Sequence, residues 1–79
     1  MLGEAIRELR EQHRLTTDEL CTDARMSPAQ LTDLEAGRLD PDLELIAAIA
    51  RALGVRTSEI FVRAEQLAAR GPAQEPGPR

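Results

Sequence analysis

Residues 16–37 read TTDELCTDARMSPAQLTDLEAG, and this stretch decides the fold. It contains two helix starts of the same kind, because Thr16 precedes Glu19 by three positions and Ser27 precedes Gln30 by three. In a capping box, the hydroxyl accepts from the third helical N–H while the acid or amide side chain accepts from the cap N–H. The pattern therefore predicts two short, consecutive helices.

The first of these helices is expected from about Thr17 to Asp23 or Ala24. The second is expected from Pro28, whose missing N–H costs nothing at the first helical position, to Gly37. About three residues remain to turn the chain between them: Ala24, Arg25 and Met26. Met26 is the expected apolar plug under this corner. Two short helices joined so tightly form a helix-turn-helix.

Three more helices flank this motif, each identified by apolar residues at helical spacing. A helix over about 3–13 has the stripe Leu2, Ile6 and Leu9. A helix capped by Asp42 and stopped by Gly54 is expected to face inward at Leu43, Ile46, Ile49, Ala50 and Leu53. A last helix over about 57–69 has an apolar face made of Ile60, Phe61, Ala64, Leu67 and Ala68.

These elements predict an all-α protein with one compact five-helix domain over residues 1–70. The last helix is longer than closing the core requires. Residues 71–79 read GPAQEPGPR and have one weak apolar residue, so we expect a disordered tail.

Composition narrows the function classes. A single cysteine, Cys21, excludes an internal disulfide, and no apolar run reaches the roughly 18 residues that a membrane helix needs. We therefore expect a cytoplasmic protein with no membrane partner. Phe61 is the one aromatic residue, so a nucleic acid would be read in a groove and not by stacking.

The charge balance is acidic. Ten arginines and no lysines against 14 acidic residues give a net charge of −4, whereas proteins that bind phosphate backbones are usually basic. Residues 14–42 hold three arginines and seven acids. Asp18, Glu19 and Asp42 fall in first helical turns, where the helix dipole favours them. Asp33 and Asp40 have no such explanation.

Spacing predicts one ion pair and no active site. Arg10 borders the stripe of the first helix, and Glu35 follows Leu31 by four positions on the third, so we expect these two charges to pair between helices. Cys21 is expected to be a small buried apolar residue, and His13 a surface residue. No second histidine or nucleophilic pair suggests an enzyme, a metal or a cofactor.

Residues 2–61 as a whole resemble the lambda-repressor and Cro type of helix-turn-helix regulator, often called XRE-like. The resemblance is carried by IRELREQHRLTTDEL, by Ala24, Met26 and Ser27 in the turn, by LTDLEAGRLDP and by LELIAAIARALGV. It implies a DNA-binding transcriptional regulator, a repressor for example, whose third helix enters the major groove of double-stranded DNA.

The resemblance also implies which residues meet DNA. Thr16, Thr17 and Arg38 would contact phosphates. The base-reading positions would be Pro28, Ala29, Gln30, Thr32 and Asp33, and Ser27 is a further expected DNA contact. Arg25 stands where relatives often have glycine, and it is either a phosphate clamp or a tolerated replacement in a left-handed turn. Gln30 is either the capping partner of Ser27 or an adenine reader at a given moment.

Two functions follow as expectations. The first is a homodimer on a (pseudo)palindromic operator, joined through Ala64, Leu67 and Ala68 of the last helix. The second is a protein-interaction module on the same fold, antitoxin-like or an accessory factor, whose acidic face binds a protein partner with weak or no DNA binding.

Overall fold

Five helices follow one another in the computed structural model, which describes residues 2–70. They are α1 (Leu2–Gln12), α2 (Thr17–Ala24), α3 (Pro28–Glu35), α4 (Leu43–Leu53) and α5 (Thr57–Arg70). No strand occurs within residues 2–70. The predicted all-α, five-helix architecture is thus confirmed, while the tail expected over residues 71–79 lies outside the described residues.

The helix starts are set by the expected caps. Thr16 Oγ1 accepts from the Glu19 N–H at 3.0 Å, and Glu19 Oε1 accepts from the Thr16 N–H at 2.9 Å. Ser27 and Gln30 form the same reciprocal pair at the start of α3. Asp42 Oδ1 accepts from the Leu45 N–H at 2.8 Å to cap α4. These bonds satisfy N–H groups that a helix start otherwise leaves free.

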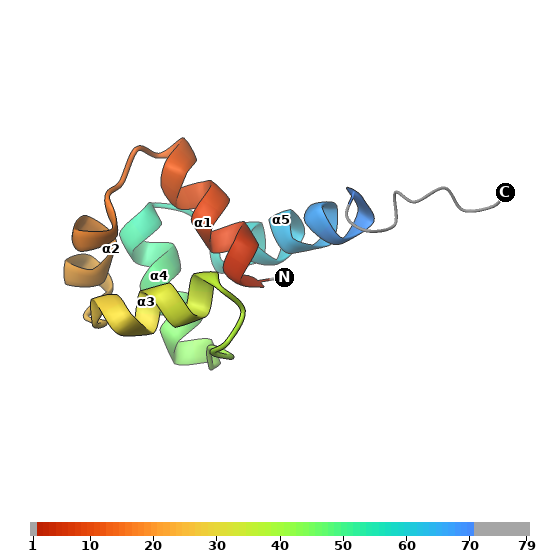
Figure 1. The fold of residues 1–79 in the computed structure, drawn as a ribbon. Coiled ribbons are helices and arrows are strands. Elements are labelled where there is room, and N and C mark those ends of the chain that lie inside the picture. Colours follow the sequence, from red (N-terminus) through yellow and green to blue (C-terminus); the bar gives the residue numbers. More distant parts are fainter. Residues whose placement is uncertain (1, 71–79) are drawn as a thin grey trace, which may run out of the picture.

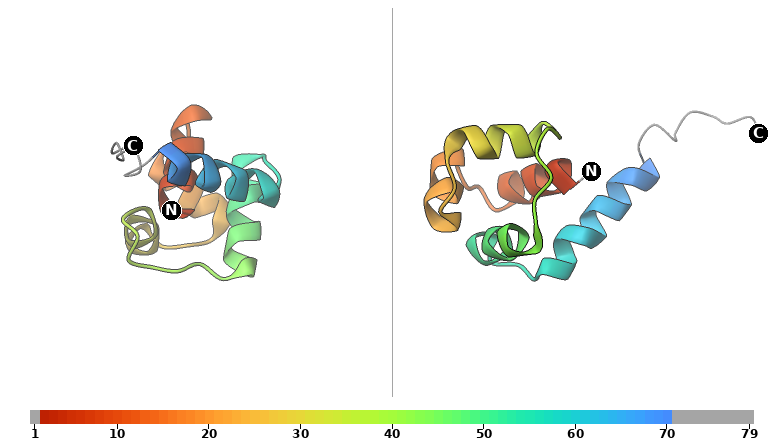
Figure 2. Two further views of the ribbon diagram at one scale, coloured as in Figure 1. Left: turned by 90° about the vertical axis from the view of Figure 1, so that its right-hand side faces the viewer. Right: turned by 90° about the horizontal axis from the view of Figure 1, so that it is seen from below.

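All five helices contribute to one core. The largest fully buried side chains come from every helix in turn: Ile6, Leu20, Leu31, Leu34, Ile49 and Ile60. Figure 1 shows α2 and α3 together on one side of the molecule, with α4 behind them and α5 running out beyond the start of α1. The right-hand view in Figure 2 shows that the C-terminal half of α5 projects from the body. The helix-turn-helix and the projecting helix therefore lie at opposite ends.

Two expected core positions are wrong. Leu43 is 73% exposed, because it is the first residue of α4 and helical side chains lean toward the N-terminus, here past the end of the packed surface. Phe61 is 39% exposed, because one residue is about 100° around a helix and the inward stripe runs through Ile60, Ala64 and Leu67. Sequence periodicity places both residues on the apolar side of their helices, but it does not show how far the other helices extend to cover them.

Two contacts that fix α1 were not expected from the sequence. Gly3 is buried against α3, and a Cβ at this position would overlap the Leu34 carbonyl oxygen. Arg63 of α5 donates to Glu8 Oε1 and to Gln12 Oε1 of α1, each at 2.9 Å. Helix α1 is thus packed closely on α3 and bonded to α5.

Candidate nucleic-acid interface

Helix α3 has one buried side and one open side. Leu31 and Leu34 are each 1% exposed and hold the helix on the core. The residues between them and before them face outward: Pro28, Ala29, Gln30 and Thr32 are exposed, and Asp33 is partly exposed. The five positions expected near the bases therefore lie at the surface, on a helix whose orientation is fixed by its apolar residues.

The turn between α2 and α3 has the expected apolar plug, because Met26 is 7% exposed. Arg25 closes α2 in a left-handed conformation, with φ 58° and ψ 48°, and its side chain is exposed. The Met26 N–H donates to the Cys21 carbonyl oxygen at 2.9 Å and ends the helix. The backbone of Arg25 thus occupies a left-handed conformation that favours glycine.

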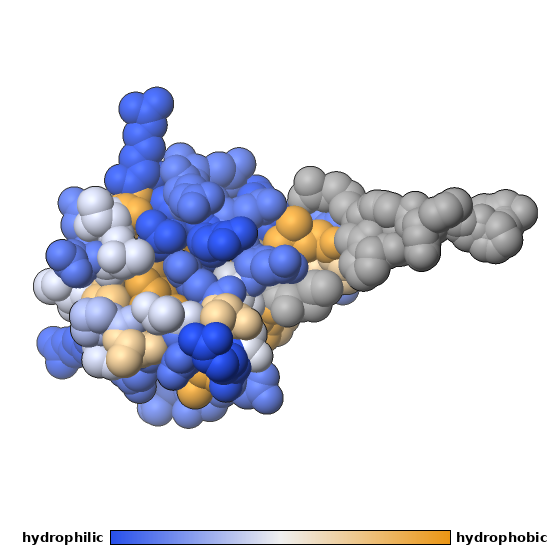
Figure 3. Space-filling model, in the orientation of Figure 1, coloured by the Kyte–Doolittle hydropathy of each residue, from blue (hydrophilic) through white to orange (hydrophobic). Residues whose placement is uncertain are grey.

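The other expected DNA contacts also lie at the surface. Thr16 and Thr17 at the start of α2, Ser27 at the start of α3 and Arg38 just past α3 are all exposed. Figure 3 shows that the side of the molecule carrying α2 and α3 is mainly hydrophilic, while hydrophobic residues gather where α5 leaves the body.

Two of the expected DNA contacts bind each other. Arg38 Nη2 lies 3.1 Å and Nε 3.3 Å from Asp33 Oδ1, and the two side chains are 65% and 50% exposed. Asp33 is therefore not an unbalanced charge, as the sequence suggested, because a neighbouring guanidinium offsets it. The signal in the sequence is the spacing of five residues, which places Arg38 just past the end of α3 and within reach of Asp33.

The side chain of Gln30 is folded back to its cap. Its Oε1 accepts from the Ser27 N–H at 2.9 Å, which fixes the amide close to the start of α3. Within residues 2–70, the amide nitrogen of Gln30 has no hydrogen-bond partner. The side chain is therefore held by its acceptor and keeps its two donors available at the surface.

An ion pair supports α3 from behind. Arg10 Nε lies 2.8 Å from Glu35 Oε2, and both side chains are 13% exposed. The same guanidinium donates from Nη1 to the Leu15 carbonyl oxygen at 3.1 Å, so it also holds the chain before α2. The pair expected from the sequence is present, and it joins α1, the α1–α2 turn and α3.

Cys21 lies near this pair and is 5% exposed, in agreement with a buried apolar role. Burial raises the pKa of its thiol above the ordinary value, and the carboxylates of Asp18 and Glu35 raise it further, against a lowering by Arg10. The neutral thiol is therefore favoured, which opposes thiolate chemistry at this residue.

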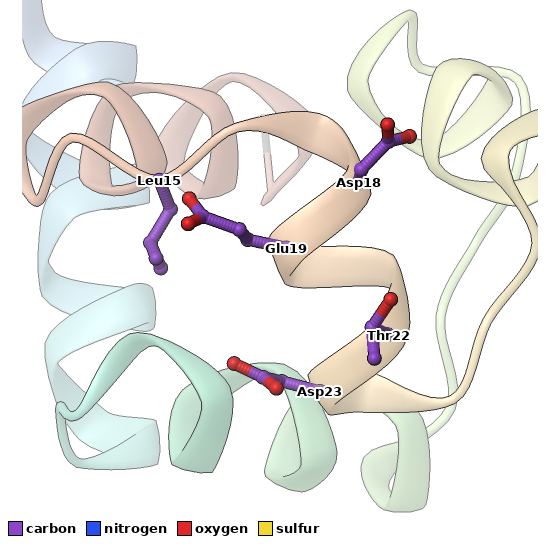
Figure 4. Close-up of a pocket in the computed structure, with 5 residues that line it drawn as sticks. All are labelled: Leu15, Asp18, Glu19, Thr22 and Asp23. Atoms are coloured by element: carbon purple, nitrogen blue, oxygen red, sulfur yellow. The ribbon is translucent and has the colours of Figure 1, made fainter.

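A shallow acidic hollow lies on the outer side of α2. Its lining residues are Leu15, Asp18, Glu19, Thr22 and Asp23. Figure 4 shows that four of them come from α2, and that Asp18 and Asp23 point away from the helix in different directions. Three carboxylates around one hollow make this part of the surface unfavourable for phosphate.

These features define a helix-turn-helix protein: two consecutive short helices, α2 and α3, a short turn closed by Met26, and an open side on α3. The helix-turn-helix domain family matches residues 1–60 of the chain. The chain belongs to the lambda-repressor and Cro type, the XRE-like family of helix-turn-helix regulators.

Curated relatives include multiprotein-bridging factor 1 of Candida albicans, 42% identical over 55 residues, which cover 70% of this chain and 36% of that protein. The immunity repressor protein of Bacillus phage phi105 is 36% identical over 59 residues, 75% of this chain and 41% of that protein. The chain thus spans less than half the length of these two relatives.

Solved structures give the same architecture. The clp gene regulator ClgR from Corynebacterium glutamicum aligns with a TM-score of 0.89 and 36% identity, over 94% of this chain and 79% of that one. The restriction-modification controller protein C.AhdI from Aeromonas hydrophila aligns with a TM-score of 0.73 and 27% identity, over 76% and 91%. No helix within residues 2–70 is long and apolar enough to cross a membrane.

Proposed function

We propose that the protein is a sequence-specific DNA-binding transcriptional regulator that places α3 in the major groove. The observation that carries this proposal is the open side of α3, which is fixed by Leu31 and Leu34 and closed off by no other described element. The regulators among its relatives and structural neighbours support the same class of function. No catalytic role is proposed.

Within this proposal, the donors and methyl groups of α3 read bases. The amide of Gln30 can bond to adenine, Ala29 can contact a thymine methyl, and Asp33 can accept from cytosine N4 once Arg38 releases it. Pro28 and Thr32 complete the face that approaches the groove. Thr16, Thr17 and Ser27 offer hydroxyl groups to phosphates, and Arg38 offers a guanidinium.

Replacing Gln30 tests whether α3 reads sequence. We expect Gln30→Ala to weaken operator binding by about 1 to 3 kcal/mol and to relax preference at one position per half-site. Gln30→Glu is the matched control for folding, because a glutamate keeps the capping box but cannot donate to adenine. If both variants fold and keep the preference of the parent protein, Gln30 is only a capping residue.

The same proposal includes a homodimer, which doubles the DNA contacts and places two recognition helices on half-sites about one helical turn apart. The dimer surface expected on α5 needs one correction, because Ala64 is 8% exposed and already packed within the chain. Leu67 is partly buried and Ala68 is exposed. Phe61, seven residues before Ala68, extends the apolar surface that a second α5 would cover.

A second function, binding of a protein partner, is favoured by the acidic hollow on α2. Asp18, Glu19 and Asp23 would repel phosphate and attract a basic surface. This alternative predicts that no duplex sequence is enriched in a selection at low salt. It also predicts that Asp23→Asn, on the hollow and off α3, leaves DNA binding unchanged while weakening the partner complex.

A further inference from the structure

The two turns that flank α2 contain the two non-glycine residues of the described chain with left-handed backbones, Arg14 after α1 and Arg25 after α2. Arg14 has φ 57° and lies two residues before the cap Thr16, and Arg25 has φ 58° directly after Ala24. Both are arginines and both are exposed. A residue with a Cβ is strained in this conformation, whereas glycine is not.

The backbone of these turns requires no arginine. The Arg14 N–H donates to the Glu11 carbonyl oxygen at 3.0 Å, and the Arg25 N–H to that of Thr22 at 3.3 Å. A glycine would make both bonds equally well. The left-handed backbone at each position is a usual way for a helix to end, but the helix end does not explain why the residue is an arginine and not a glycine.

The two side chains also have no partner within residues 2–70. Three other arginines are engaged by carboxylates: Arg10 by Glu35, Arg38 by Asp33 and Arg63 by Glu8. Arg14 and Arg25 form no ion pair and no side-chain hydrogen bond in this part of the chain. They are thus free cations on either side of a helix whose own side chains are acidic.

We propose that Arg14 and Arg25 are a pair of phosphate-binding residues that contact the DNA backbone on either side of α2. This inference rests on the proposed function and adds Arg14 to its contacts, while assigning Arg25 the role of a clamp. The first helix of a helix-turn-helix crosses the DNA backbone, and an eight-residue helix is about 12 Å long. The two guanidinium groups can therefore reach phosphates on either side of the crossing, each through two N–H donors.

A residue with a Cβ costs some stability in a left-handed helix end compared with glycine, and both arginines bear this cost at exposed positions. The positions of the two arginines also compensate for the acidic character of the surface formed by α2 and α3. Arg38 is occupied by Asp33, so Arg14 and Arg25 supply the cations that α2 and α3 otherwise lack. Arginine in place of glycine at both positions then raises the affinity for DNA. It does so at some loss of stability of the folded protein.

Glycine variants give a test in which stability and affinity change in opposite directions. We expect Arg14→Gly and Arg25→Gly each to raise the melting temperature by about 2 to 8 °C, because the strain is relieved. Binding of each variant to a fluorescent duplex of random sequence should weaken about tenfold at low salt. The slope of log affinity against log salt should flatten by about 0.9 for each phosphate contact removed.

Two controls separate the loss of a phosphate contact from a change in net charge and from a change in backbone conformation. Arg14→Lys and Arg25→Lys keep the cation, so the salt slope of the parent protein should remain. Arg7→Ala removes an exposed arginine from the middle of α1 and should leave the slope unchanged. If the parent protein binds the duplex and the glycine variants match Arg7→Ala in affinity and slope, the clamp is overturned and the proposed function stands. If the parent protein binds no duplex at low salt, the proposed function fails and the clamp fails with it.

Discussion

Arg10 and Arg38 each form one close ion pair, with Glu35 and with Asp33, but the two pairs differ in their surroundings. The Arg10–Glu35 side chains are 13% exposed, and the Arg38–Asp33 side chains are 65% and 50% exposed. Removing one partner of a buried pair leaves a charge without water or a counter-charge, whereas an exposed partner is solvated again. We expect Arg10→Ala to lower the free energy of unfolding by about 3 kcal/mol or more.

The exposed pair supplies the control for that measurement. Arg38→Ala should cost less than about 1 kcal/mol in the same urea titration. Similar losses for the two variants would mean that Arg10 and Glu35 do not behave as a buried pair and do not lock α1 to α3.

Asp33 is the residue whose charge the sequence left unexplained and which the structure pairs with Arg38. Asp33→Asn removes a negative charge from the open side of α3 and frees the guanidinium of Arg38. We expect tighter binding to duplexes of random sequence and a salt slope steeper by about one phosphate contact, roughly 0.9. Measured by fluorescence anisotropy, loss of operator binding at unchanged stability would instead make Asp33 a cytosine reader.

At the scale of elements, Gly3 sets the distance between α1 and α3. An alanine in a helix is usually more stable than a glycine by about 0.5 to 1 kcal/mol. Here the added Cβ would meet the backbone oxygen of Leu34, which cannot move without shifting α3. We therefore expect Gly3→Ala to destabilise the protein by about 1 to 3 kcal/mol, with the sign opposite to helix propensity. A thermal melt that shows Gly3→Ala above the parent protein would contradict this close approach.

Helix limits could be predicted from the sequence wherever a cap with its own side chain sets them. Thr16, Ser27 and Asp42 cap the three helices that the sequence assigns to them. Which side chains face the core was predicted less well, because Leu43 and Phe61 lie on apolar stripes but are exposed to solvent. A cap is a local contact over three residues, whereas burial depends on which other helix lies opposite, and a periodic pattern contains no such information.

The molecule as a whole has an apolar surface on α5 that a second copy would cover. We expect Ala68→Glu to give a folded monomer, because Ala68 is exposed in the single chain and a carboxylate would be buried only in the dimer. Ala69→Glu is the matched control, since Ala69 is also exposed but lies about 100° further around the helix. Sedimentation should show a dimer for the parent protein and for Ala69→Glu. A parent protein that stays monomeric at tens of micromolar would remove this interface.

The sequence was sufficient to predict which residues of the site lie at the surface. It was not sufficient to predict which of them pair with each other or which backbone conformations they adopt. The ten expected DNA contacts all have surface positions, because the two capping boxes and the buried leucines fix the rotation of α3. The pairing of Asp33 with Arg38 and the left-handed backbone of Arg14 were not foreseen. Both arise where a helix ends and the chain turns, and helical spacing does not apply there.

The central claim is that α3 reads DNA sequence, and selection from a random duplex library at low salt tests it most directly. We expect an enriched sequence with two related half-sites centred about 10 base pairs apart, one for each α3 of a dimer. Recovery of duplexes with no shared sequence, from a protein that is folded and at a concentration where it is dimeric, would contradict the claim.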